Sequence, residues 1–95
     1  MHKFAFIGEV WRWPGDAGWH FVNLPKAVSK KIQAVGKKYG AGFVKVEVVV
    51  GKTTWVTALF PHRKSETYLV SLKQSIRKKE SIFEDSRIRV TIKLI

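Results

Sequence analysis

Three histidines, His2, His20 and His62, are the side chains of this 95-residue chain best suited to acid–base chemistry or metal binding. None of them stands in an H-E-x-x-H or H-x-x-x-H pattern, which would place two imidazoles on one face of a helix. The chain has no cysteine, which excludes disulfides, thiolate metal sites and cysteine nucleophiles. We therefore interpret the histidines as surface or strand-face residues and expect no metal site.

The usual motifs for a nucleophile or a phosphate loop are missing as well. The sequence contains no G-x-S-x-G, no S-x-x-K beside S-D-N and no G-x-x-x-x-G-K. Residues 36–42 are rich in glycine, but they end a predicted helix rather than start one, so they do not direct a helix N-terminus at a phosphate. The neighbouring carboxylates Glu84 and Asp85 fall in a predicted turn, where solvation explains them. We expect a domain that is not an enzyme and needs no cofactor.

Positive charge is the strongest functional signal in the sequence. Eighteen Lys and Arg against seven Asp and Glu give a net charge of +11. Such a surplus on a small body attracts polyanions, so we expect weak nucleic-acid binding without sequence selectivity. A solvated surface and a protein partner are the alternatives. The candidate residues are a stripe on the first helix (Lys26, Lys30, Lys37), a loop (Arg63, Lys64) and a basic run (Arg77, Lys78, Lys79).

Aromatic residues form the second candidate site. They gather in one predicted hairpin and on a neighbouring strand: Trp11, Trp13, Trp19, Phe21 and Trp55. Large rings can fill the core of a small barrel, which is the simpler interpretation. Alternatively, they form a partly exposed groove, with Trp13 the most exposed because it ends a strand beside Pro14. Such a groove would stack the bases of single-stranded nucleic acid or hold a small apolar ligand.

Hydrophobic periodicity in the first half predicts two strands and a helix. The strands are Lys3–Trp13 and Trp19–Leu24, and the turn signals between them indicate a hairpin. Proline fits the first turn of a helix, so the helix is predicted at Pro25–Lys38. Its apolar stripe of Val28, Ile32 and Val35 is expected to face the core.

The second half predicts four more strands and a short helix. The strands are Phe43–Val50, Thr53–Phe60, Thr67–Val70 and a last strand from Arg87. In the last strand, Ile88, Val90, Ile92 and Leu94 should face the core, and Arg87, Arg89 and Lys93 should face the solvent. Residues 71–74 match a capping box, so a short helix is predicted from there to about Lys79.

These elements indicate a mainly β fold, a small six-stranded barrel-like domain with one longer and one short α-helix. A single domain over residues 1–95 suits this length. The first nine residues reach Glu9 too early for a secretory signal, and the apolar runs are shorter than the roughly 18 residues that span a membrane. We therefore expect a cytoplasmic protein that has no membrane partner.

Several stretches together resemble the bacterial domain-of-unknown-function family numbered 1905. They are residues 13–25 (WPGDAGWHFVNLP), 42–47 (GFVKVE) with 54–61 (TWVTALFP), and 68–73 (YLVSLK) with 76–78 (IRK). Two positions depart from the family pattern. Ala58 stands where the family often has serine, and Glu84 replaces the usual glycine of the last turn, which puts the geometry of that turn in question.

The resemblance implies mainly a fold. Members of the family are similar to a double-split β-barrel, related in shape to swapped-hairpin transcription regulators. The family has no established catalytic residues, so none is transferred to this chain. Members often stand beside a bacteriocin-protection-like domain, which implies an accessory role. The likeness to DNA-binding regulators is an analogy of fold alone.

Overall fold

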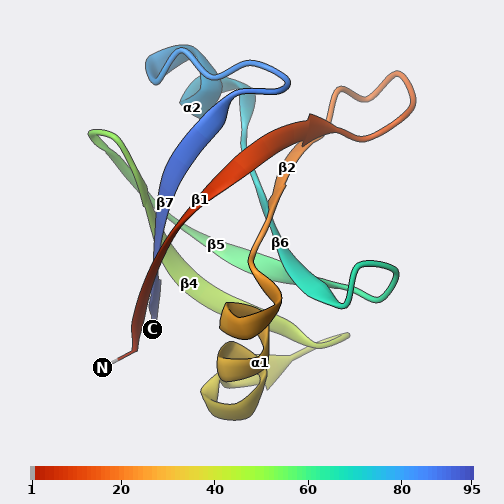
Figure 1. Ribbon diagram of the computed structural model, residues 1–95, viewed down its shortest axis with the longest axis vertical. Helices are drawn as coiled ribbons and strands as arrows, with labels where there is room; N and C mark the ends of the chain where they lie inside the picture. The colour runs from red at the N-terminus through yellow and green to blue at the C-terminus, as the bar shows by residue number, and fades with distance from the viewer. Residues whose placement is uncertain (1) are drawn as a thin grey trace.

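Six strands close into an antiparallel barrel in the computed structural model, which describes residues 2–95 (Figure 1). The barrel order is β4, β5, β6, β2, β1, β7 and back to β4, and the short strand β3 extends the sheet beside β4. The strands are β1 (Lys3–Arg12), β2 (His20–Asn23), β3 (Lys38–Tyr39), β4 (Phe43–Val50), β5 (Thr53–His62), β6 (Thr67–Ser71) and β7 (Arg87–Leu94). The helices are α1 (Lys26–Val35) and α2 (Gln74–Lys79). The predicted fold class is confirmed.

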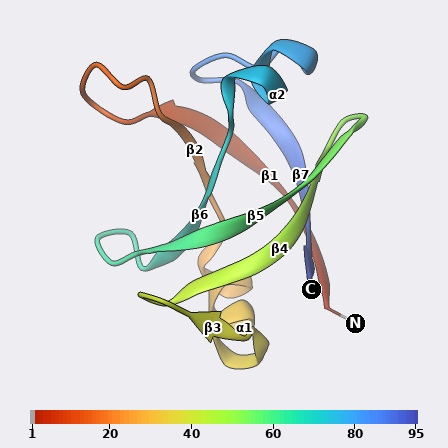
Figure 2. The same ribbon diagram turned by 180° about the vertical axis from the view of Figure 1, so that it is seen from behind.

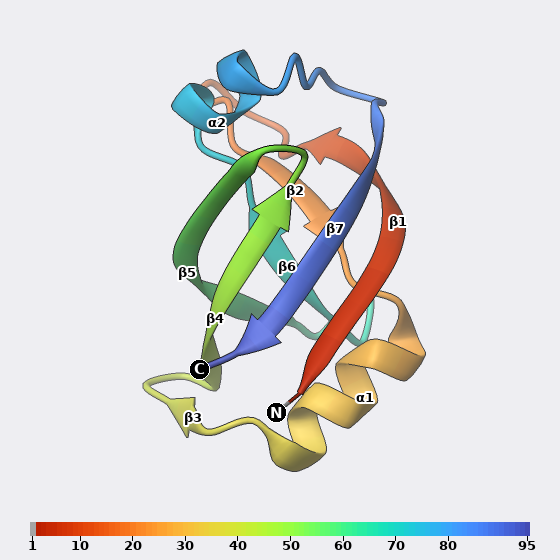
Figure 3. The same cartoon turned by 90° about the vertical axis from the view of Figure 1, so that its left-hand side faces the viewer.

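Strand β1 is shared between two parts of the barrel. Residues 3–9 pair with β7, and residues 10–12 pair with β2. Gly8 lies where β1 changes partner. A Cβ atom at Gly8 would come within 2.4 Å of Val22 Cγ1, so glycine lets β1 approach β2 closely at this point. On the other side, β4 closes the barrel by pairing with β5 and with β7, and Figure 3 shows β4, β7 and β1 side by side.

Alternating residues of the strands fill the barrel. In β4 the four even-numbered valines from Val44 to Val50 are buried, as the alternation predicts. In β7, Val90 and Ile92 are buried, whereas Arg87 and Arg89 are exposed, which confirms the predicted faces of that strand. A slip by one residue would bury cations, and the cost of desolvating them fixes this register.

Helix α1 covers one end of the barrel, and it is shorter than predicted. It begins at Lys26, directly after Pro25, and ends at Val35 rather than Lys38. Gly36 adopts an extended conformation, and a Cβ atom there would lie 2.7 Å from the carbonyl oxygen of Ile32. The chain therefore leaves the helix at Gly36, and Lys38 belongs to β3.

The inward face of α1 also differs from the prediction. Ile32 is fully buried and Val28 packs against the core, but Val35 is 49% exposed, so its predicted burial was wrong. Val35 is the last residue of the helix and lines a surface hollow with Tyr39. Instead, Ser29 is buried, and its Oγ accepts a hydrogen bond of 3.1 Å from the backbone N–H of Tyr68. This bond ties α1 to β6.

Helix α2 lies at the opposite end of the barrel from α1, as Figures 1 and 2 show. The predicted capping box was wrong. Ser71 is the last residue of β6, and Lys73 precedes the helix without a side-chain capping bond from any described residue.

The turn before β7 forms without glycine because Asp85 takes the left-handed conformation (φ 71°), which aspartate tolerates better than most residues. Within residues 2–95, neither helix is long and apolar enough to cross a membrane.

Candidate functional site

The predicted aromatic site lies on the outside of the barrel, over β1, β2 and β5. Trp11 of β1 pairs with Phe21 of β2. Trp11 directly follows Val10, and Phe21 directly precedes Val22. Val10 and Val22 are fully buried in the core, so strand alternation directs Trp11 and Phe21 outward. Neither ring belongs to the barrel core. The simpler interpretation, in which these rings fill the barrel, was therefore wrong for the hairpin.

Phe21 is the centre of this outer cluster. Its ring centroid lies 5.5 Å from that of Trp11, 5.9 Å from Trp13 and 6.3 Å from Trp19. The rings of Trp19 and Phe21 are nearly parallel, at 6°. Phe21 is only 6% exposed, whereas Trp13 and Trp19 remain 43% and 54% exposed. The prediction that Trp13 is the most exposed ring was therefore wrong, because Trp19 in the following loop exposes more of its side chain. Phe21 thus forms a floor, and two tryptophans present open ring surface above it.

A chain of hydrogen bonds holds the cluster from behind. The indole Nε1 of Trp11 donates to Oδ1 of Asn23 over 2.6 Å, and Nδ2 of Asn23 donates to Oγ1 of Thr67 over 3.0 Å. Thr67 Oγ1 lies 2.7 Å from Ser65 Oγ, which lies 2.7 Å from Nδ1 of His62. These hydrogen bonds fix the side chains of Trp11 and His62, against which Trp13 packs.

The exposed rings line an open groove of about 400 Å³. Its walls are Trp13, Trp19, Phe21, Phe60, Pro61, His62 and Leu69. Phe60 and His62 were not among the predicted groove residues, and His62 lies beyond the predicted strand end at Phe60. Continuing the alternation from buried Leu59 would have directed both residues outward, onto the same surface as Phe21.

Neither Trp11 nor Trp55 lines this groove, which corrects their prediction as groove residues. Trp11 instead packs against Trp13 and Phe21. Trp55 lies apart from the other rings. It pairs with the buried Val48 and packs against the barrel core. Its Nε1 is buried and has no hydrogen-bond partner within residues 2–95. Trp55 therefore packs on the core, as the simpler interpretation predicts. The other four candidate rings, Trp11, Trp13, Trp19 and Phe21, do not.

A hollow towards α2 adjoins the groove at one end. It measures about 300 Å³ and shares Trp19 with the groove. Lys73 and Arg77 line it, so one face of the Trp19 side chain borders apolar rings and another borders two cations. Arg77 Nε also donates to the carbonyl oxygen of Leu72 over 3.1 Å, which holds the guanidinium near the start of α2.

A second hollow adjoins the groove at the other end, between α1 and the turn that joins β5 to β6. It measures about 380 Å³, shares Pro61 and His62 with the groove, and is lined by Lys30 and Arg63. Buried Tyr68 also lines it. Burial raises the pKa of the Tyr68 hydroxyl, so this group stays neutral at physiological pH and brings no negative charge.

We call these three depressions the outer track. It extends from α2, past the aromatic groove, to α1, and it carries cations at both ends and rings in the middle. Figure 1 shows that the loop after β1 and the turn after β5 project from the same side of the barrel, and residues of both segments line the outer track. Strand pairing brings these segments together, because β2 joins β1 to β6 and β6 joins β2 to β5.

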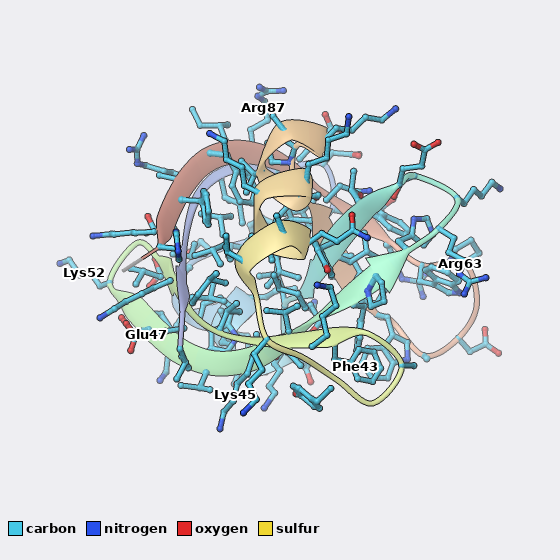
Figure 4. All side chains as sticks on the ribbon, turned by 90° about the horizontal axis from the view of Figure 1, so that it is seen from below. Phe43, Lys45, Glu47, Lys52, Arg63 and Arg87 are labelled. Carbon is cyan, nitrogen blue, oxygen red and sulfur yellow. The ribbon has the colours of Figure 1, made fainter. Side chains whose placement is uncertain are left out.

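The predicted cations do not form one continuous face. Three of the eight line the outer track: Lys30, Arg63 and Arg77. Lys78 lines an adjoining hollow with Arg77, and Lys37 lines a separate one beside Tyr39. The other three, Lys26, Lys64 and Lys79, are exposed elsewhere on α1, the β5–β6 turn and α2. Figure 4 shows labelled cations extending outward in several directions, among them Lys45, Lys52 and Arg87.

Lys73 of the track was not among the predicted cations, because it lies outside the basic run of residues 77–79. Its contribution follows from the position of α2 beside Trp19. No group of three or more His, Asp and Glu side chains lies close enough to hold a metal ion in the part of the chain described here.

Comparison with protein families gives one match. Residues 6–92 match the model described as Domain of unknown function (DUF1905). The match covers most of the chain and confirms the resemblance read from the sequence. A search of curated proteins found no match.

Proposed function

We propose that this chain, which belongs to the domain of unknown function family DUF1905, is a binding domain for single-stranded nucleic acid. In this proposal the nucleic acid strand lies along the outer track. The observation that carries the proposal is the pair of exposed tryptophans, Trp13 and Trp19, between two cationic hollows. The proposed activity is binding rather than catalysis. A net charge of +11 supports a polyanionic ligand.

Base stacking is the role proposed for the rings. Nucleobases stack on exposed aromatic side chains with about 1–3 kcal/mol per base, and every base offers such a face. Trp13 and Trp19 have exposed ring surface, and Phe21 supports them from below. Bases in a duplex are already stacked on each other, so the rings favour a single strand.

Phosphate contacts are the role proposed for the cations at the ends of the track. Lys73 and Arg77 lie on one side of the rings, and Lys30 and Arg63 on the other. Four phosphate contacts to a single strand give a slope of about −3 in a plot of log affinity against log salt. The affinity should therefore fall about 50-fold between roughly 50 and 200 mM salt.

Sequence selectivity is not expected from this arrangement. Stacking and phosphate contacts are tolerant of base identity, because neither reads the hydrogen-bonding edge of a base. The exposed rings, rather than the scattered lysines, then fix where the strand binds. We expect dissociation constants of roughly 10⁻⁴–10⁻⁶ M at physiological salt, as for other non-specific complexes.

A small apolar ligand in the groove is the second candidate, and the apolar floor of Phe21 and Leu69 favours it. Pockets for small molecules usually enclose most of the ligand surface, whereas this groove is open along the track. An apolar ligand would also leave the cations of both hollows without a role. For these reasons the nucleic acid is the preferred occupant.

Titration of labelled oligonucleotides of about 10 nucleotides, single-stranded and duplex, tests the proposal. The single strand should bind more tightly than the duplex and should show the steep salt dependence given above. Equal binding of both forms would contradict the stacking role. Binding that ignores salt, or no binding at about 50 mM salt, would contradict the nucleic-acid proposal and favour the small ligand.

A further inference from the structure

The walls of the hollow between α1 and the β5–β6 turn come from α1, from that turn and from the ends of β5 and β6. Ser29, Lys30 and Gln33 come from α1, while Arg63 and Glu66 come from the turn. Ser29 Oγ accepts the backbone N–H of Tyr68, which locks α1 to β6. The backbone N–H of Glu66 donates to the carbonyl oxygen of Arg63 over 3.1 Å and closes the turn. The backbone that carries the charged side chains is therefore held in place without a ligand.

Charge in this hollow favours an anion. Lys30 and Arg63 reach it from two different elements, and one carboxylate, Glu66, opposes them. The walls thus carry a net positive charge, while Tyr68 stays neutral. Arg and Lys are the side chains that bind phosphate oxygens most strongly, through charge-assisted hydrogen bonds.

The position of the hollow links it to the aromatic groove. Pro61 and His62 form a wall between the two and line both. The hydrogen-bond chain from His62 through Ser65 and Thr67 to Asn23 keeps that wall in register with Trp11. A ligand that joins a flat ring to an anionic group over a short linker would occupy both sites at once.

We infer that this hollow is a phosphate subsite, which binds the phosphate next to the base that stacks in the groove. The inference rests on the proposed function and deepens it, because it names a nucleoside monophosphate as the smallest ligand with both parts. Lys30 and Arg63 are the phosphate ligands, and Glu66 weakens the site by repulsion.

Comparison of AMP with adenosine tests this inference, with amide chemical shifts of the α1 and β5–β6 segments as the readout. AMP should bind at least about tenfold more tightly than adenosine, since hydrogen bonds to a charged group are worth more than neutral ones. Inorganic phosphate alone should shift the amide signals of the hollow. Equal binding of AMP and adenosine by the unmodified protein would overturn the inference.

Matched variants locate the effect. The double variant Lys30→Gln/Arg63→Gln should lose the preference for AMP and keep its affinity for adenosine. The control Lys26→Gln/Lys64→Gln changes one lysine of the same helix and one of the same turn, both outside the hollow, and should keep the preference. Glu66→Gln should tighten AMP binding several-fold. Equal losses in both double variants would overturn the subsite.

The oligonucleotide titration separates failure of the subsite from failure of the proposed function. If single-stranded oligonucleotides bind along the track but AMP gains nothing over adenosine, the phosphate subsite is wrong and the proposed function stands. If oligonucleotides do not bind at low salt, the proposed function is wrong, and the phosphate subsite, which depends on it, is wrong as well.

Discussion

The interior of the barrel and its aromatic outer face are both built from apolar side chains, but different forces hold them. Inside, Val46, Val48 and Val90 are completely buried by strands on all sides. Outside, one side of the sheet supports the rings, and Asn23 fixes the position of Trp11 through a hydrogen bond. The interior therefore stabilises the fold, whereas the outer face keeps ring surface free for a ligand.

The two tryptophans Trp11 and Trp55 show what decides between these fates. Both lie on barrel strands, and both are half-buried. Trp55 pairs with inward-facing Val48, and Trp11 pairs with outward-facing Phe21. The indole N–H of Trp11 has a partner, whereas that of Trp55 has none among the described residues. The position of a tryptophan in the alternation of its strand, and not its residue type, decides whether it packs on the core or on the outer face.

The largest effect is expected inside the barrel. Ile32→Ala should lower the free energy of unfolding by about 2–5 kcal/mol, because it removes a fully buried side chain and leaves a cavity. Val35→Ala, three residues later on the same helix, should change it by less than about 0.5 kcal/mol. Denaturant unfolding of both variants measures the difference. A small loss for Ile32→Ala would show that α1 does not close the barrel.

On the outer face, a substitution should weaken ligand binding and leave the free energy of unfolding almost unchanged. Trp19→Ala should weaken binding of a single-stranded oligonucleotide roughly 5- to 150-fold, the cost of one lost stacking platform. Its unfolding free energy should change by less than about 0.5 kcal/mol, because Trp19 is more than half exposed. Trp55→Phe is the control and should bind like the unmodified protein. The comparison between the two faces fails if Trp55→Phe impairs binding as much as Trp19→Ala does.

Asn23 should link stability to the outer face. Asn23→Ala removes the acceptor of Trp11 Nε1 and the donor to Thr67, so the unfolding free energy should fall by about 1–2 kcal/mol. Binding should weaken as well, because the rings lose their fixed positions. Gln33→Ala, at an exposed amide of α1, serves as the control for stability. Unchanged stability in Asn23→Ala would show that packing alone orders the rings.

The smallest effect concerns Tyr68 at high pH. Burial raises the pKa of this hydroxyl in the folded protein above the usual value of 10.0. Above about pH 10 the unfolded chain then releases a proton that the folded chain retains, so the stability that Tyr68 contributes is lost as pH rises. Tyr68→Phe should show a smaller alkaline loss of stability in thermal unfolding between about pH 9 and 11. An unchanged loss would place its origin in other groups.

Sequence patterns predicted the barrel well where one face of a strand is buried. The alternating valines of β4 and the alternating cations of β7 determine the orientation of those strands, because a slip would bury charge. The helix was predicted to continue to Lys38, although its apolar spacing stops at Val35 and Gly36 follows, which is a usual signal for a helix end. Gly36 takes an extended conformation, and this change in the backbone ends the helix.

The candidate site was predictable in composition but not in assembly. The hairpin spacing already grouped Trp11, Trp13, Trp19 and Phe21. Phe60 and His62 join them because β6 pairs with β5 in a local hairpin and with β2, which is far away in the sequence; only the second pairing has no local signature. For the same reason, the sequence could not show that Lys30 and Arg63 share one hollow.

The indole N–H signals of the four tryptophans test the central claim most directly, because the residues differ in position and not in chemistry. We expect a single-stranded oligonucleotide, titrated into the protein and followed by two-dimensional NMR, to shift the signals of Trp13 and Trp19 strongly. The signal of Trp55, inside the barrel, should remain in place. Shifts confined to lysine-rich segments, with the signals of Trp13 and Trp19 unchanged, would contradict the claim that the strand binds along the outer track.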